Sequence, residues 1–217
     1  MSARENILAR IRAAQGRSGV PDAQERAGVA AHLGAHPEGP RPGQAADPVA
    51  NFKACAHRLS TTVDPVGTLA EVPAAVARYL AEHNLPRTAV CWPELIELEW
   101  EAAGIAVEAR AAEGGDLVGI TGAFCAIAET GTLLTLSGPR TPATTSLLPE
   151  THIAVVRASR LVRSMEDAWK LLRAENGDAF MPRAANFISG PSRTADIEQT
   201  LVLGAHGPYR VHIVLVG

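Results

Sequence analysis

One short polar region near the end of the chain gathers most of the side-chain types that bind or act on small molecules. Residues 190–198 read GPSRTADIE, and residues 204–208, which read GAHGP, follow closely. Strand-like apolar segments flank the region, at 186–189 and 211–216. A simple turn needs only a few Gly, Asn or Pro residues. Polar loops on a rigid sheet often carry function, so this region is the first candidate site.

The donors of this region suit an anionic ligand. Arg193 can bind a carboxylate or a phosphate in bidentate fashion. Ser192 or Thr194 can cap a short helix whose N-terminus attracts negative charge. Gly190 follows a strand, so we expect it at the carboxyl edge of the sheet, where open α/β sheets hold ligands. A salt-bridged, capped turn without a ligand is the alternative interpretation.

His206 is the candidate acid–base group, and Asp196 is its candidate partner. Glycines on both sides of His206 allow a ligand to approach the backbone closely. The imidazole can act as a general base or donate a hydrogen bond to an anion, although a lone histidine is also common as a structural residue. Asp196 either orients His206 or anchors Arg193. The candidate ligand-binding residues of the region are Gly190, Ser192, Arg193, Thr194 and Gly207.

Glu129 is a third candidate catalytic residue, because it interrupts an apolar run between residues 120 and 136. Burying a carboxylate without a partner is costly. Glu129 therefore reaches solvent at a cleft, pairs with Arg140 or Arg193, or accepts hydrogen bonds from turn amides. A carboxylate in such surroundings is a site candidate. Arg140 lies in a Gly- and hydroxyl-containing loop that suits anion binding and suits a surface turn almost as well.

Composition narrows the function classes. The chain has 217 residues, 47% of them hydrophobic, and a formal net charge of -3. This charge gives no global basic field for nucleic acid or an anionic membrane. The sequence has no P-loop, no GxGxxG fingerprint, no GxSxG elbow and no HExxH motif. We therefore expect no nucleic-acid partner, no membrane insertion and no cofactor bound by this chain.

The cysteines indicate a reducing compartment. Cys55, Cys91 and Cys125 are far apart and form no CxxC pair, so no metal or iron–sulfur site is expected. An odd number of dispersed cysteines fits the cytosol better than a disulfide framework. The first 15 residues lack the apolar core of a signal peptide, and no window reaches membrane-spanning length. We expect a soluble cytoplasmic protein.

The pattern of elements predicts an α/β fold with a mainly parallel sheet flanked by helices. Residues 1–48 should form a helix, capped by Ser2 and Glu5, followed by a Gly/Pro-rich linker, and residues 49–217 the α/β domain. Residues 51–59 suit either a strand or a short helix. The expected helices are 71–84, 93–103 and 164–175, and the expected strands are 88–92, 105–108, 117–128, 132–137, 151–157, 186–189 and 211–216.

These motifs resemble the lactate-utilisation (LUD) domain family, and within it the short single-domain C-type branch. The similarity rests on residues 190–198 and 204–208, on Ala-Glu-Thr-Gly-Thr at 128–132 and on Ser-Leu-Leu-Pro at 146–149. It extends from about residue 51 to the last residue. The resemblance implies a fold similar to the sugar-isomerase, CoA-transferase and formyltetrahydrofolate cyclo-ligase (NagB/RpiA/CoA transferase-like) superfamily.

The resemblance also implies a function. The chain would be a non-redox subunit that takes part in oxidising L-lactate to pyruvate with partner proteins that carry iron–sulfur clusters. It would hold a small carboxylate or phosphorylated ligand between Glu129, Arg140, Arg193 and His206. Two alternatives stay open. Glu129-Thr130-Gly131 looks like the nucleophilic glutamate of CoA-transferases, which suggests a stand-alone transferase or ligase, and a regulatory or assembly protein without chemistry is the other.

Overall fold

The computed structural model describes all residues except 1, 17–19, 42, 44, 178–179 and 196–198. The chain divides into two units, residues 1–41 and residues 42–217. No described helix is long and apolar enough to cross a membrane.

The first unit contains two helices. Helix α1 (Ala3–Ala14) has the expected capping box, in which Ser2 and Glu5 satisfy each other's backbone amides. Residues 16–48 are not linker throughout, because α2 (Ala23–Ala35) lies within them. An Asp22–Glu25 capping box starts α2, and the helix is rich in alanine, the best helix former. The Gly and Pro residues after His36 stop it, as expected.

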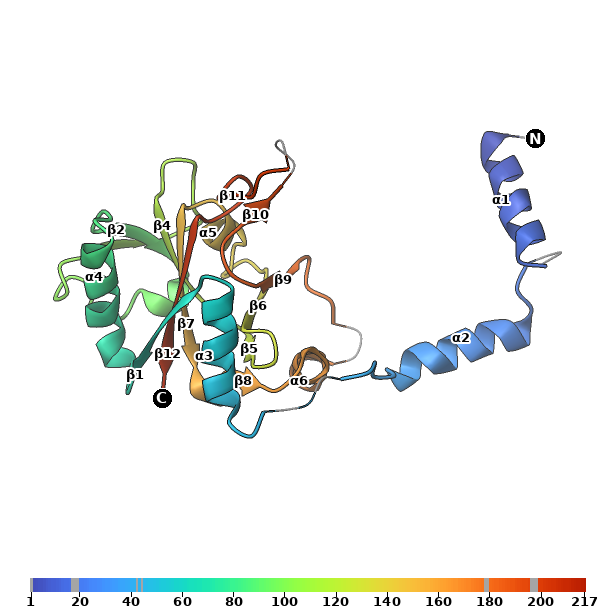
Figure 1. Ribbon diagram of the computed structural model, residues 1–217, viewed down its shortest axis with the longest axis horizontal. Coiled ribbons are helices and arrows are strands. Elements are labelled where there is room, and N and C mark those ends of the chain that lie inside the picture. The colour runs from blue at the N-terminus through green and yellow to red at the C-terminus, as the bar shows by residue number, and fades with distance from the viewer. Residues whose placement is uncertain (1, 17–19, 42, 44, 178–179, 196–198) are drawn as a thin grey trace. The chain divides into compact units, whose positions relative to one another are not determined.

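The second unit is built on a six-stranded sheet, which confirms the expected fold class (Figure 1). Every recorded strand pair in this sheet is parallel. From one edge to the other the strands are β1 (Thr62–Val66), β12 (Arg210–Val216), β7 (Thr151–Arg157), β4 (Val118–Gly122), β2 (Thr88–Cys91) and β3 (Ala106–Ala109).

The two faces of this sheet are covered differently. Helix α4 (Val72–Glu82) packs on one face, where Val76 and Leu80 join Ile153 and Val214 in a buried cluster. Helix α3 (Pro48–Arg58) and a second sheet cover the other face. The strands of the second sheet are, in order, β8 (Leu161–Val162), β5 (Cys125–Ile127), β6 (Thr132–Leu136) and β9 (Ala185–Ile188). Helix α6 (Met165–Asn176), capped by Ser164 as expected, packs behind it.

Two expected elements differ from the structure, and a third, which suited either a strand or a helix, is a helix. Residues 117–128 form two strands in different sheets, because the chain leaves the main sheet after Gly122. Residues 93–103 form only a 3₁₀ turn (Pro93–Leu95) and further turns, because the indole of Trp100 is buried and donates to the Leu95 carbonyl. Residues 51–59 are helical, since Asp47 caps α3 and Pro48 occupies its first turn.

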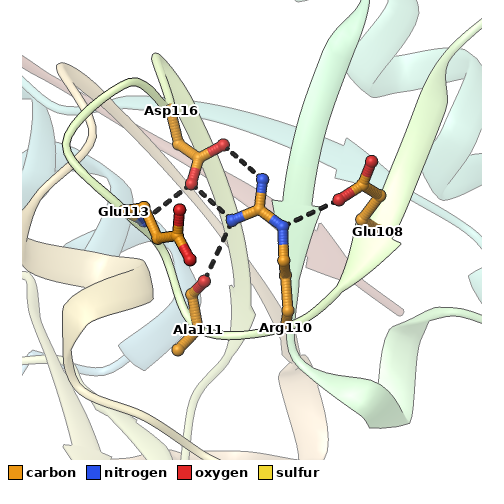
Figure 2. A network of polar contacts seen from close by, with 5 residues as sticks. All are labelled: Glu108, Arg110, Ala111, Glu113 and Asp116. Atoms are coloured by element: carbon orange, nitrogen blue, oxygen red, sulfur yellow. Dashed lines mark hydrogen bonds and ion pairs between the residues drawn. The ribbon is translucent and has the colours of Figure 1, made fainter.

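The loop before β4 is fixed by a charge network (Figure 2). The Arg110 guanidinium donates to both carboxylate oxygens of Asp116, at 2.7 and 2.8 Å, and to Glu108 at 2.7 Å. The Glu113 amide also donates to Asp116. The Arg110 hydrogen bonds hold the pKa of Asp116 below its usual range. The network lies near the surface, so it orders the loop more than it stabilises the fold.

The last turns of α3 make unusually close backbone contacts with two loops. Gly131, in the β5–β6 turn, has φ +67°, and a Cβ there would lie 2.3 Å from the Ala56 nitrogen. Gly190, after β9, has φ +84°, and a Cβ there would lie 2.3 Å from the Leu59 carbonyl oxygen. Only glycine allows these approaches without strain. The glycines of two sequence motifs therefore have a packing role.

Replacing Gly131 by Ala should lower the free energy of unfolding by about 3 kcal/mol, because a Cβ meets backbone atoms at a left-handed position. Gly114→Ala is the matched control, since nothing lies within 4 Å of its Cβ position, and should change stability by less than about 0.5 kcal/mol. Urea unfolding of both variants measures the difference. Equal stability of the two variants would contradict the α3 packing.

Candidate functional site

The described residues of the polar region, 190–195 and 199–208, lie at the amino edge of the main sheet, which corrects the expected carboxyl edge. Gly190 does follow a strand, but β9 belongs to the second sheet and pairs antiparallel with β6. The chain then forms the β10–β11 hairpin (Arg193–Thr194 and Val202–Leu203) and enters β12 at its first residue. In Figure 1 this hairpin and α5 (Thr144–Leu147) lie at the opposite end of β12 from the C-terminus.

Backbone hydrogen bonds join the two halves of this region. The Ser192 amide donates to the Pro208 carbonyl, and the Gly204 amide donates to the Ser192 carbonyl, both at 2.9 Å. The Cβ position of Gly207 lies 3.4 Å from the Ser192 Cβ and 3.8 Å from the Leu147 carbonyl oxygen. The structure therefore brings three motif segments together, those around Leu147, Ser192 and Gly207.

A cleft of about 670 Å³ opens between residues 147–150, which precede β7, the segment 203–207 and the first residue of β12. Its polar groups come from His206, Arg210, Glu150 and Tyr209, and its apolar surface comes mainly from Leu147, Leu148 and Leu203. The backbones of Gly204, Ala205 and Gly207 complete the lining. This size is in the range of small-molecule sites.

Two side chains that line the cleft make no hydrogen bond or ion pair with a described residue. The Arg210 guanidinium lies 4.9 Å from the Tyr209 ring centre and makes no hydrogen bond or ion pair with a described residue. The exposed His206 ring likewise bonds to none of the residues that the structure describes. The two groups are therefore available to a ligand. The sequence interpretation missed Arg210, and its position directly after the GAHGP segment was the signal that could have found it.

Arg193 does not line the cleft. Its guanidinium donates to the Leu59 carbonyl at 2.9 Å and to the Ser60 hydroxyl at 2.7 Å. These atoms form the end of α3, whose last carbonyls lack helical partners and carry partial negative charge. Arg193 thus caps a helix. Thr194 is buried in the hairpin.

Glu129 also serves a helix end in this structure. Its Oε1 accepts a hydrogen bond from the Met165 amide, in the first turn of α6, at 2.9 Å. The expected donors were turn amides, and the observed donor is the amide of a helix. The neighbouring cavity, lined in part by Asn51, Ala128 and Arg163, has a volume of only about 20 Å³.

Arg140 is not among the residues that line the cleft. Arg140 is exposed in a tight turn closed by a Gly138–Thr141 bridge, and it contacts none of the other candidate residues within the described part of the chain. Asp196 lies outside the described residues. Among the described residues no three His, Cys, Asp or Glu side chains are grouped to hold a metal ion.

Two buried histidines flank the site in the main sheet. His152, fully buried on β7, bonds through Nε2 to Thr121 Oγ1 at 2.8 Å. His212, on β12, bonds through Nδ1 to Thr62 Oγ1 at 2.7 Å and stacks on Tyr79. Burial lowers the pKa of each imidazole to about 4, so both are neutral at pH 7.

A match to a known protein family includes the three motif segments. The LUD domain family matches residues 116–216, which include all three. Residues 116–216 of the chain are similar to the LUD domain family. This match agrees with the resemblance that the sequence motifs indicated.

Individual relatives with similar sequences carry lactate-utilisation names. "Lactate utilization protein C" of an Exiguobacterium species is 45% identical over 100 residues, which cover 46% of this chain and 44% of the relative. The protein with the same name in Bacillus subtilis is 38% identical over 119 residues, covering 54% of this chain and 49% of the relative. The chain thus spans about half the length of the curated relatives it matches.

A solved structure supports the fold. The crystal structure of a DUF162 family protein from Deinococcus radiodurans superposes with a TM-score of 0.59 at 25% identity. The match covers 81% of this chain and all of the other. The likeness therefore extends beyond the LUD segment.

The neutral buried histidines should make the fold acid-sensitive. Their folded pKa of about 4 lies below the ordinary value of 6.5, so the unfolded chain binds protons first and stability falls as pH drops below 6.5. Between pH 7.5 and pH 5 each histidine should cost about 2 kcal/mol of unfolding free energy. Urea unfolding at both pH values measures the sum.

His152→Gln should remove about half of this pH-dependent loss, whatever its effect on absolute stability. Exposed His57→Gln is the matched control and should leave the loss unchanged. A stability that is flat between pH 7.5 and pH 5 in the unmodified protein would contradict the neutral buried state of both rings.

Proposed function

We propose that this protein acts in lactate utilisation as a non-redox subunit that binds a small carboxylate in the cleft at the amino edge of its sheet. The observation that carries the proposal is the pairing of Arg210, which has no internal acidic partner among the described residues, with the exposed His206 in a glycine-framed loop. The names of the relatives, which refer to lactate utilisation, supply the pathway.

Each wall of the cleft suits one part of a 2-hydroxy or 2-keto acid. Arg210 supplies a planar pair of donors that matches a carboxylate. His206 is exposed and can accept or donate a hydrogen bond to the oxygen on the neighbouring carbon. Leu147, Leu148 and Leu203 offer apolar surface to a methyl group. A compact monocarboxylate fits this division better than a long polar ligand.

The oxidation of L-lactate to pyruvate releases two electrons and two protons. In this proposal His206 takes the hydroxyl proton, and the C2 hydrogen leaves with both electrons, as a hydride, to a two-electron acceptor in the partner proteins, whose iron–sulfur clusters carry the electrons onward. The chain's own thiols are poor candidates for such centres, because Cys55, Cys91 and Cys125 are each buried at separate places in the fold.

The geometry gives less support to a transferase that uses Glu129 as nucleophile. The Glu129 carboxylate is engaged by the α6 amide, and the cavity beside it has room for about one water molecule. An acyl thioester needs far more space. The transferase remains a hypothesis, and detection of an acyl group covalently bound to Glu129 would support it.

Binding can be tested directly on the full chain. Isothermal titration with L-lactate, pyruvate and inorganic phosphate should show a carboxylate ligand, and Arg210→Gln should weaken its binding at least about tenfold through loss of the charged pair. Arg140→Gln is the control, since Arg140 is exposed outside the cleft and should have no effect. Binding that depends on Arg140 and not on Arg210 would contradict the proposal that the ligand binds in the cleft.

The proposed iron–sulfur partners can be tested in the native cells. Affinity capture of the tagged chain from cells grown on L-lactate should recover brown proteins with iron–sulfur absorbance, which cells grown on another carbon source yield in smaller amount. Capture of the chain alone, colourless, with normal growth of the deletion strain on lactate would contradict a role in this pathway.

A further inference from the structure

A group of buried polar side chains lies beneath the cleft, between the two sheets, and the proposed function does not use it. His152 and Thr121 come from the inner face of the main sheet, Thr145 from α5, and Thr135 and Asn186 from the second sheet. We call these five residues the buried polar cluster. The side chains of His152, Thr121, Thr145 and Thr135 are almost completely buried.

Strand register places the members of this cluster face to face. Ala154, Leu133 and Ile188 belong to the apolar layer that joins the two sheets. His152 lies two residues before Ala154 on the same face of β7, and Thr135 lies two residues after Leu133 on the same face of β6. Asn186 is directly opposite Thr135. The polar residues therefore lie in the same layer between the sheets, next to its apolar residues.

Helix α5 closes the cluster on the cleft side. The Thr145 carbonyl oxygen lies only 2.0 Å from the Cβ position of Gly119, and Gly119 is the neighbour of His152 across the β4–β7 pair. Thr145 therefore covers the strand position next to His152. The next residues, Leu147 and Leu148, line the cleft above.

Four polar atoms of this cluster lack partners. They are His152 Nδ1, Thr145 Oγ1, Thr135 Oγ1 and Asn186 Nδ2, none of which is hydrogen-bonded to a described residue. His152 uses only Nε2, which bonds to Thr121. Leaving a buried polar atom without a partner is unfavourable, so four in one layer would be a large penalty for a native fold.

We propose that the buried polar cluster is a binding site for ordered water. The atoms include a donor, the Asn186 amide, two hydroxyls that donate and accept, and an imidazole nitrogen, which together match the bonding of water. The cluster holds no charged side chain, so a small neutral polar molecule fits it and an ion does not. Each water molecule would bond two to four of these groups.

The test is water-to-protein cross-relaxation by NMR on the isotope-labelled full chain. We expect cross-peaks of a long-lived water to the His152 ring protons, and a His152 Nδ1 nitrogen shift typical of a hydrogen-bonded nitrogen. The double change Thr145→Val and Thr135→Val, which keeps side-chain volume, should remove the cross-peaks and move that shift.

Thr151→Val is the matched control. Thr151 is also fully buried with an unbonded hydroxyl, but it precedes His152 and therefore points to the opposite face of the sheet. This variant should keep the cross-peaks. The proposal is wrong if the unmodified protein shows no water cross-peaks to His152, or if they persist in the double variant. The measurement on the unmodified protein decides the matter even where a variant does not fold.

Discussion

The contact of helix α3 with two loops determines where the motif residues can point. The β5–β6 turn and the segment after β9 both touch the last turns of α3 through glycine backbones, at Gly131 and Gly190. Arg193 then caps the same helix end by donating to Leu59 and Ser60. Residues that look catalytic in the sequence thus satisfy backbone groups that folding leaves unpaired. These contacts hold the start of β10 against the end of α3.

The cleft follows from that placement. Once the hairpin is anchored at Arg193, Ser192 binds Pro208 and aligns the glycine-framed His206 with the first turn of β12. Arg210 begins that strand, and α5 supplies the apolar wall opposite. The amino edge of the sheet therefore carries the polar loops in this protein, although most open parallel sheets use the carboxyl edge. The route of β9 through the second sheet accounts for the difference.

Local patterns were enough to predict the elements with strong local signals. Strand β7 matches its expected range, and the capping residues Ser2 and Ser164 start the helices they were expected to start. Strand β1 escaped prediction because Asp64 and Pro65 break its apolar pattern, and pairing with β12 stabilises it instead. The role of Arg193 could not be predicted, because its partner Leu59 is 134 residues away in the chain. Glu129 illustrates the same limit, since its amide partner belongs to a distant helix.

The central claim is that a small carboxylate binds between Arg210 and His206 and not beside Glu129. A crystal structure of the full chain grown with pyruvate tests it most directly, because the electron density locates the ligand without assuming any activity. The account predicts density in the amino-edge cleft, with the carboxylate within hydrogen-bond distance of the Arg210 guanidinium. Density beside Glu129 and Arg163, with an empty cleft, would contradict it.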